Sequence, residues 1–325
     1  MTVAGPVLGL DIGGTKLTVG VVGPDGAVRS ERVEPTPATA SPLEILELLF
    51  AMSEAAIGEA GLWWSDLWAT GISFGGPVHF PTGTTVTCHH LAGWEGFPLR
   101  DRVAERAGTP VVMDNDANAA ALGETRFGAA RGCEHVLYLT VSTGIGGGLV
   151  LGGRVHRGAN SMAGEIGHTL VAPGGPECTC GRRGCLEAVA SGPAIARAAR
   201  EALASGQVSA LNSLPAEDIT ARDVGEAAPS DALAARVMRQ AGEFLGIAIA
   251  AAVNLVNPGI VVIGGGVSHA GPAFLDPVRE TVTRLAVPES ACDLRIVAGE
   301  LGPRGGLLGA AALALEEPHP ECAEG

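Results

Sequence analysis

The amino-acid sequence predicts an α/β protein that consists of two related halves. Short apolar segments with the length of strands alternate with longer segments with the length of helices, and this alternation is typical of α/β folds. A strand, a glycine-rich turn and a second strand follow one another near residue 10, and the same unit recurs near residue 145. This recurrence indicates two α/β halves with a cleft between them.

The composition agrees with a folded globular chain and excludes several other classes. The 325 residues include 48 glycines; 46% are hydrophobic and 17% are charged, whereas disordered chains combine low hydrophobicity with high charge. The formal net charge is −14 and no basic run occurs, which argues against a nucleic-acid partner. No uninterrupted apolar segment is long enough to cross a membrane, and no secretory signal is recognisable. We therefore expect a cytoplasmic protein without a nucleic-acid or membrane partner.

The first half of the chain is predicted to contain strands and two helices. The strands are expected at 7–11, 17–22, 27–33, 68–73 and 111–114. The first helix is expected to begin after Ser41, which precedes Pro42 as an N-cap, and to end near Ala60. The second helix is expected over residues 115–127, directly after the last of these strands.

The second half is predicted to repeat this organisation around a loop-rich section at 152–190. Strands are expected at 135–142, 149–151, 260–263 and 294–297, and helices at 193–205, 231–256, 272–285 and 307–315. The longest of these helices ends at Asn257-Pro258, a sequence that stops helices.

The first candidate site is the turn from Asp11 to Lys16, with the sequence Asp-Ile-Gly-Gly-Thr-Lys. Gly13 and Gly14 allow backbone N–H groups to approach a phosphate closely. Thr15 adds a hydroxyl donor, Lys16 is the only lysine of the chain, and the Asp11 carboxylate suits Mg²⁺. The alternative is an ordinary hairpin turn, which the flanking aspartate, threonine and lysine make less favoured.

Two further glycine clusters follow strands, at 144–148 and 264–266. The first could cradle phosphate together with the Asp11 turn, so that the two turns hold one triphosphate, and the second suits a base or ribose packed on backbone. Neither cluster matches the glycine pattern of P-loop proteins or of dinucleotide-binding enzymes.

A group of polar residues at 114–118 marks the change from strand to helix. One of them is needed as an N-cap, but four polar residues lie together here. A carboxylate at such a position can act as general base toward a hydroxyl, and Asp116 is the favoured candidate.

Three cysteines and a histidine form a candidate metal site. Cys178, Cys180 and Cys185 lie downstream of His168, and three thiolates with one imidazole suit a structural zinc ion. The alternatives are free cysteines in a loop or redox-active cysteines, although no C-x-x-C pair is present. The second nitrogen of His168 could face a substrate hydroxyl. Glu165 and Glu187 flank the unit as candidate polyol contacts or as ordinary solvated glutamates.

These motifs together resemble those of the ROK family of sugar kinases (repressor, open reading frame, kinase), within the actin/hexokinase-like ATPase superfamily. The resemblance extends over nearly the whole chain. It rests on segments 11–16, 115–124, 142–148, 164–168, 178–187 and 263–267. The glycine–histidine and cysteine segments are the most specific of these.

The resemblance implies two α/β domains of ribonuclease H-like fold, with a sugar and ATP in the interdomain cleft. It implies ATP-dependent phosphorylation of a hexose hydroxyl with Mg²⁺, a structural Zn²⁺ and a homodimeric or homotetrameric assembly. The small domain is expected to comprise 1–117 and about 303–317. The larger domain is expected at 118–302 with the zinc loop at 164–187, followed by a frayed tail at 318–325.

The resemblance also implies roles for single residues. The catalytic base is expected to be Asp116. The sugar contacts are expected to be Gly76, Asn115, Asp116, Glu165, His168 and Glu187. The phosphate and Mg²⁺ contacts are expected to be Asp11, Gly13, Gly14, Thr15, Thr143 and Gly144, with Gly265 on the nucleoside side. The zinc ligands are expected to be His168, Cys178, Cys180 and Cys185.

The expected reaction is phosphorylation of the 6-hydroxyl of a hexose, with glucose as the first choice. Segments 73–78 and 88–91 depart from the family pattern and are expected near the sugar, so N-acetylmannosamine, N-acetylglucosamine or a cyclitol is the alternative substrate. Phe74 is expected to pack in the core rather than against the sugar, and His89-His90 to form a polar loop.

Two observations separate the kinase from the other members that the resemblance suggests. About six residues precede the first predicted strand, so we do not expect the helix-turn-helix domain that repressors of this family carry. A non-catalytic sugar sensor is less favoured because Asp116 and both phosphate turns are present.

Overall fold

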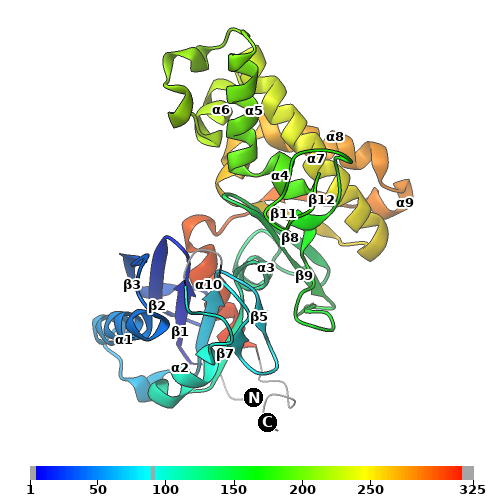
Figure 1. The fold of residues 1–325 in the computed structure, drawn as a ribbon. Helices are drawn as coiled ribbons and strands as arrows, with labels where there is room; N and C mark the ends of the chain where they lie inside the picture. The colour runs from blue at the N-terminus through cyan, green and yellow to red at the C-terminus, as the bar shows by residue number, and fades with distance from the viewer. Residues whose placement is uncertain (1–4, 89–91, 317–325) are drawn as a thin grey trace. The chain divides into compact units, whose positions relative to one another are not determined.

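The computed structural model describes residues 5–88 and 92–316, which form two compact units (Figure 1). The first unit comprises Met1–Gly132, Gly148–Ala163 and Leu301–Gly325, and the second comprises Cys133–Gly147 and Gly164–Glu300. The chain therefore passes between the units at four places, and neither unit is a single continuous segment. The predicted loop at His89-His90 and the tail at 318–325 lie outside the described residues.

The first unit contains a five-stranded sheet in the order β3-β2-β1-β4-β7. Its strands are β1 (Val7–Ile12), β2 (Lys16–Val22), β3 (Val28–Pro35), β4 (Thr70–Phe74) and β7 (Val111–Asn115). Strands β1, β2 and β3 pair antiparallel, whereas β4 and β7 continue the sheet parallel to β1. Strands β1 and β4 are buried along their whole length, which explains the mostly apolar sequence of β1.

Helices cover both faces of this sheet. Successive side chains of β1 point to opposite faces, and each set packs against different helices. Leu8, Leu10 and Ile12 join the core beneath α1 (Pro42–Glu59) and α2 (Leu99–Ala107). The alternate residues of β1 face α10 (Gly305–Leu315), which also packs on α3 (Asp116–Phe127).

Local sequence explains where these helices begin and how closely they approach the sheet. Ser41 caps α1 in a capping box with Glu44. Helix α10 can lie close against the sheet because Gly71 has no side chain. A Cβ at this position would collide with the carbonyl oxygen of Ala310. A small hairpin, β5 (Val78–His79) and β6 (Thr84–Thr85), completes the first unit.

The second sheet repeats the first, in the order β10-β9-β8-β11-β12. Its strands are β8 (Val136–Val141), β9 (Ile145–Leu151), β10 (Arg154–Val155), β11 (Ile260–Gly264) and β12 (Arg295–Ala298). An antiparallel pair, β9 and β10, lies on one side, and β8, β11 and β12 run parallel. The internal repeat predicted from the two glycine-turn units is confirmed by this topology.

The helices of the second unit are built around one long helix. They are α4 (Leu186–Ala190), α5 (Gly192–Ala204), α6 (Ala221–Ala227), α7 (Ala232–Val256), α8 (Pro272–Leu285) and α9 (Pro288–Ala291). Asp231 caps α7 at its start, and Asn257 ends it in the left-handed conformation. Short 3₁₀ turns lie at Trp64–Asp66, Ile166–His168, Ala210–Ser213, Ala216–Asp218, Gly266–Ala270 and Gly302–Arg304. Over the described residues, every helix is too short or too polar to span a membrane.

The structure differs from the sequence-based elements in three respects. The glycine cluster at 144–148 was expected to form a turn, but β9 begins at Ile145 and includes three of its glycines. Helices α2, α4, α6 and α9, strand β10 and the β5–β6 hairpin were not predicted. The contacts also group residues 118–132 with the first unit, because α3 packs on α10, so the division at residue 117 stays a prediction.

Candidate functional site

Asp11 lies at the carboxyl end of β1, on the face of the sheet that α10 covers. Its side chain is only 9% exposed, and Oδ1 accepts a hydrogen bond of 2.9 Å from the Ser73 hydroxyl. Burial raises the pKa of Asp11, while the Ser73 hydrogen bond and the charge of Lys16 lower it. No side chain fits at Gly306, because its Cβ would collide with the Asp11 carboxylate.

The turn after Asp11 is only partly exposed, and the backbone of Gly13 already has hydrogen-bond partners within the chain. Gly13 donates its N–H to the Lys16 carbonyl at 3.1 Å, and the Gly13 carbonyl accepts the Thr36 hydroxyl at 2.7 Å. Thr15 is exposed, whereas the Lys16 ammonium donates to the Pro303 carbonyl at 2.9 Å. The lysine therefore ties the turn to the segment that precedes α10.

The junction between β7 and α3 carries two of the predicted sugar contacts, Asn115 and Asp116, and Asn115 also contacts a third, Gly76. Asn115 caps α3, since its Oδ1 accepts the Ala117 N–H at 2.9 Å, and its Nδ2 donates to the Gly76 carbonyl at 3.1 Å. Asp116 is the first residue of α3, is exposed, and accepts the same N–H at 2.8 Å. The cap expected in this segment is thus Asn115, which leaves Asp116 at the surface beside it.

Phe74 has the packing role that the sequence analysis favoured. Its ring is fully buried and lies 5.0 Å from the Trp94 ring, between centroids. It therefore belongs to the core of the first unit.

In the second unit, the predicted metal ligands lie together. One ligand atom from each of His168, Cys178, Cys180 and Cys185 lies within 4.8 Å of all the others. His168 Nδ1 is 3.7 Å from Cys178 Sγ, and the sulfurs of Cys180 and Cys185 are also 3.7 Å apart. Three sulfurs and one imidazole in this arrangement can hold a metal ion.

Two thiols of this cluster have shifted pKa values. Burial, with the neighbouring thiols, raises the pKa of Cys185 to about 12. The pKa of Cys180 is lowered, first by a hydrogen bond from the backbone N–H of Arg182. Metal binding to such a cluster requires deprotonated thiols and therefore releases protons.

Glu187 connects the cysteine loop with the turn after β8, a link that the sequence analysis missed. Its Oε2 accepts the backbone N–H of Ile145 at 3.0 Å, and its Oε1 accepts the Thr179 hydroxyl at 3.2 Å. On the other side of the loop, Glu165 Oε2 lies 3.8 Å from His168 Nε2. The two nitrogens of His168 thus face different groups, one the cysteines and the other a carboxylate.

The remaining candidate residues of the second unit lie at the carboxyl ends of parallel strands. Thr143 and Gly144 form the bend after β8, and Gly265 follows β11 with a positive φ of 83°. A side chain at Gly265 would meet the backbone of Val141, at the end of the neighbouring strand. In open α/β sheets, ligands bind at this edge.

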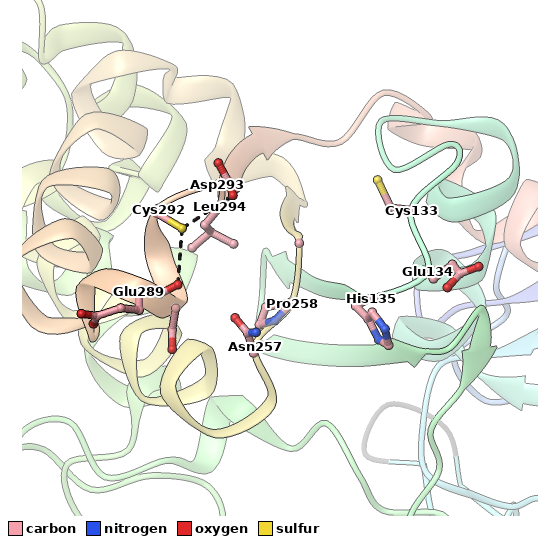
Figure 2. A pocket seen from close by; sticks show the side chains of 11 residues that line it. Cys133, Glu134, His135, Asn257, Pro258, Glu289, Cys292, Asp293 and Leu294 are labelled. Carbon is pink, nitrogen blue, oxygen red and sulfur yellow. Dashed lines mark hydrogen bonds between the residues drawn. The ribbon is translucent and has the colours of Figure 1, made fainter.

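A cavity of about 360 Å³ lies at the opposite edge of the same strands (Figure 2). Residues that directly precede β8, β11 and β12 line it, including His135, Pro258 and Leu294. None of the predicted site residues lies in its wall, so the cavity is separate from the candidate site.

The fold and the candidate residues define the class of protein. Each of the two five-stranded sheets combines an antiparallel part with parallel strands. The solved structures that this chain resembles share the two-domain actin-like ATPase fold. The chain belongs to the ROK family, whose model matches residues 7–317. The predicted fold class and family resemblance are confirmed.

Curated relatives include two kinds of sugar kinase. The chain is 41% identical to a glucokinase from Halalkalibacterium halodurans over 78% of each chain, and 35% identical to a glucokinase from Thermotoga maritima over 95% of this chain and 97% of the relative. It is also 36% identical to an N-acetylmannosamine kinase from Escherichia fergusonii, over 95% of this chain and 98% of the relative.

Two solved structures match almost the whole chain. One is a ROK family glucokinase from Streptomyces griseus in complex with glucose and AMPPNP, with 37% identity, a TM-score of 0.81 and coverage of 96% of this chain and 100% of that one. The other is a ROK hexokinase from Thermus thermophilus, with 38% identity, a TM-score of 0.78 and coverage of 95% and 97%.

Proposed function

We propose that this protein is an ATP-dependent hexose kinase that phosphorylates the 6-hydroxyl of glucose. The observation that carries the proposal is the 37% identity, over 96% of this chain, to the Streptomyces griseus glucokinase that was solved with glucose and AMPPNP. The glucokinase relatives at 35–41% identity support the same substrate. We further propose a cytoplasmic homodimer or homotetramer, whose assembly light scattering would measure.

In the proposed reaction Asp116 accepts the proton of the sugar hydroxyl. The hydroxyl oxygen then forms a bond to the γ-phosphorus of ATP, and the bond from that phosphorus to the bridging β–γ oxygen breaks, so ADP leaves. The exposed position of Asp116 at the start of α3 supports this role. Gly76, Asn115, Glu165, His168 and Glu187 are the proposed sugar contacts.

The phosphates of ATP are proposed to lie on the backbone of the two strand-end turns. The proposed contacts are Gly13, Gly14, Thr15, Lys16, Thr143 and Gly144, with Gly265 on the nucleoside side. The buried Asp11 carboxylate fits a hard cation, and Mg²⁺ held there would offset the negative charge of the phosphates.

Zinc is the metal we propose for the cluster of His168 and the three cysteines. The donor set of three sulfurs and one imidazole nitrogen supports zinc rather than magnesium or calcium. When bound, zinc would hold the loop of 168–187 in one conformation. The side chains of Glu165 and Glu187 would then be presented to the sugar from a fixed backbone.

The base assignment predicts that Asp116→Asn lowers kcat by about 10²–10⁴-fold, because the hydroxyl loses its proton acceptor. Glucose binding, measured by calorimetry, is expected to persist, since the amide retains the shape of the carboxylate. The matched control is Asp101→Asn, which removes an exposed carboxylate of α2 and is expected to leave kcat unchanged. Near-normal turnover by Asp116→Asn would contradict the assignment.

The substrate is tested with a panel of sugars in an assay that couples ADP release to a measurable signal. Glucose is expected to give the highest kcat/KM. The similarity to N-acetylmannosamine kinases makes amino sugars the second candidate, and a preference for N-acetylmannosamine or N-acetylglucosamine would replace the glucose assignment. Sugar binding without ADP release for every sugar would instead indicate a non-catalytic sensor.

A further inference from the structure

A buried ion pair supports the segment that carries the proposed base. Arg157 Nε lies 2.6 Å from Asp114 Oδ2, and the Asp114 side chain is only 1% exposed. Both residues belong to the first unit, Asp114 on β7 and Arg157 on the segment that follows β10. Neither residue has a place among the proposed substrate or metal contacts.

The Asp114 carboxylate connects the end of β7 with the first turn of α3. While Oδ2 contacts Arg157, Oδ1 accepts the backbone N–H of Asn115 at 2.8 Å and the side-chain amide of Asn118 at 2.9 Å. Asp116 lies between the two residues that Oδ1 holds. The position of the proposed base therefore depends on where this carboxylate is held.

Arg157 is itself held on several sides. Its guanidinium lies 3.6 Å above the centroid of the Phe80 ring, a distance typical of a cation–π contact. The Phe80 N–H donates to the Ser161 hydroxyl at 3.1 Å, and the Ala163 N–H donates to the Arg157 carbonyl at 2.9 Å. With 19% of its side chain exposed, Arg157 is a preorganised partner for the carboxylate.

The positive charge of Arg157 stabilises the buried Asp114 carboxylate. A buried carboxylate that loses its cationic partner is strongly destabilised. Glu316 also interacts with this pair: burial raises its pKa, the charge of Arg157 lowers it and the charge of Asp114 raises it. Without Arg157, Asp114 would keep its hydrogen bonds to Asn115 and Asn118 but lose its cationic partner, and the carboxylate would be expected to move.

We propose that Arg157 is a positioning residue for the proposed base Asp116, and that it acts through Asp114. The inference rests on the proposed kinase function. A base acts only within hydrogen-bond distance of the proton that it removes, and a displacement of about 1 Å at a reacting group can cost about 10²-fold in rate. The ion pair thus fixes catalytic geometry without contact to the substrate.

The test is Arg157→Ala in the full chain, with kcat, the KM for glucose and the melting temperature measured together. We expect kcat to fall by about 10²-fold and the KM for glucose to rise as well, because Asp114 also holds the backbone of the proposed sugar contact Asn115. Methylguanidinium is expected to restore part of the lost kcat, because it can replace the missing guanidinium beside Asp114, whereas tetramethylammonium at equal ionic strength is not. The control is Arg102→Ala, which removes an exposed arginine of α2 and is expected to retain normal kcat.

A purely structural role would lower the melting temperature but leave the kcat of the folded enzyme unchanged, and that result would overturn the proposal. If Arg157→Ala does not fold, Arg157→Lys and Asp114→Asn provide the test. Each single variant is expected to lower kcat. The kcat of the double variant is expected to be little lower than that of the less active single variant, because both substitutions act on one contact. Independent, additive losses would overturn the proposal.

Failure of this inference differs from failure of the proposed function. A wild-type protein that phosphorylates no sugar would contradict the proposed function. An active wild type with an equally active, folded Arg157→Ala variant would contradict only the positioning role.

Discussion

Asp11 shows how a single residue can serve a site at a cost to the fold. Its carboxylate is buried against α10 with one hydroxyl donor, Ser73. Burial favours the neutral form and raises the pKa. The folded chain therefore holds a proton on Asp11 more tightly than the unfolded chain does.

This shift predicts how stability changes with pH. Because the pKa of Asp11 is raised, its ionisation costs stability as the pH rises from the ordinary aspartate value through the folded value. Asp11→Asn removes that cost, so the stability of the variant relative to the wild type is expected to increase with pH from the ordinary aspartate value through the folded value of Asp11. Urea unfolding at a series of pH values measures the difference. A stability difference between Asp11→Asn and the wild type that does not change with pH would contradict this account of Asp11.

At the residue scale, sequence spacing predicts the candidate site better than it predicts the support of that site. The turn after Asp11, the group around Asn115 and the cysteine loop are short motifs whose members are close in the chain. Arg157 lies 43 positions from Asp114, and nothing in its local sequence marks it. Its contact depends on how the β5–β6 hairpin places Phe80 beneath it, which only the folded structure shows.

At the scale of elements, α10 is held against the first sheet by positions that have no room for a side chain. Its first turn contains two adjacent glycines with opposite surroundings. Gly306 faces the Asp11 carboxylate, whereas a Cβ at Gly305 would have no heavy atom within 4 Å. The pair provides a matched test of close approach.

Gly306→Ala is expected to destabilise the protein by about 1–3 kcal/mol, because the added carbon forces the Asp11 side chain or the helix to move. Gly305→Ala is expected to be neutral or to stabilise by up to about 1 kcal/mol, since alanine favours the helix. The free energy of unfolding from urea titration distinguishes the two variants. Equal changes in the free energy of unfolding for the two variants would mean that contact with Asp11 is not the reason why position 306 needs glycine.

The elements that sequence reasoning missed have physical explanations. The glycines at 146–148 indicate a turn, yet they lie in β9. Glycine is needed there because a Cβ at Gly147 or Gly148 would collide with the backbone of Gly164 or Ala117, respectively. Helix α2 is short and mostly charged, with buried residues only at Leu99, Val103 and Ala107. Its clearest local signal is Gly108, which ends the helix in the left-handed conformation.

At the scale of the whole molecule, the two units differ in their candidate metal ligands. The candidate metal cluster lies entirely in the second unit. Cysteines bind metal ions as thiolates, and the raised pKa of Cys185 opposes deprotonation. Metal affinity is therefore expected to fall as the pH is lowered.

Metal removal is predicted to loosen the second unit and spare the first. Cys180→Ala, or treatment with a chelator, is expected to release the metal and to weaken both folding stability and sugar binding. Elemental analysis measures the metal, and hydrogen exchange compares protection at 166–190 with protection in β1 and β2. The control Cys292→Ala removes an exposed cysteine outside the cluster and is expected to retain the metal. A stable, active, metal-free Cys180→Ala variant would contradict a structural role.

The repeated architecture was visible in the sequence because each half contains a strand, a glycine turn and a strand. The composition of the units was not visible, because their segments are discontinuous. Residues 148–163 belong to the first unit, although they follow the first strand of the second. Such membership depends on tertiary packing that no local pattern encodes.

The place of α10 in the chain has a consequence for biosynthesis. Helix α10 covers one face of the first sheet, yet it follows every segment of the second unit in the sequence. On the ribosome, the second unit is complete before α10 emerges, whereas the first sheet must wait with an apolar face uncovered. We therefore expect the half that is translated first to finish folding last, and nascent chains that lack α10 to be those that chaperones bind.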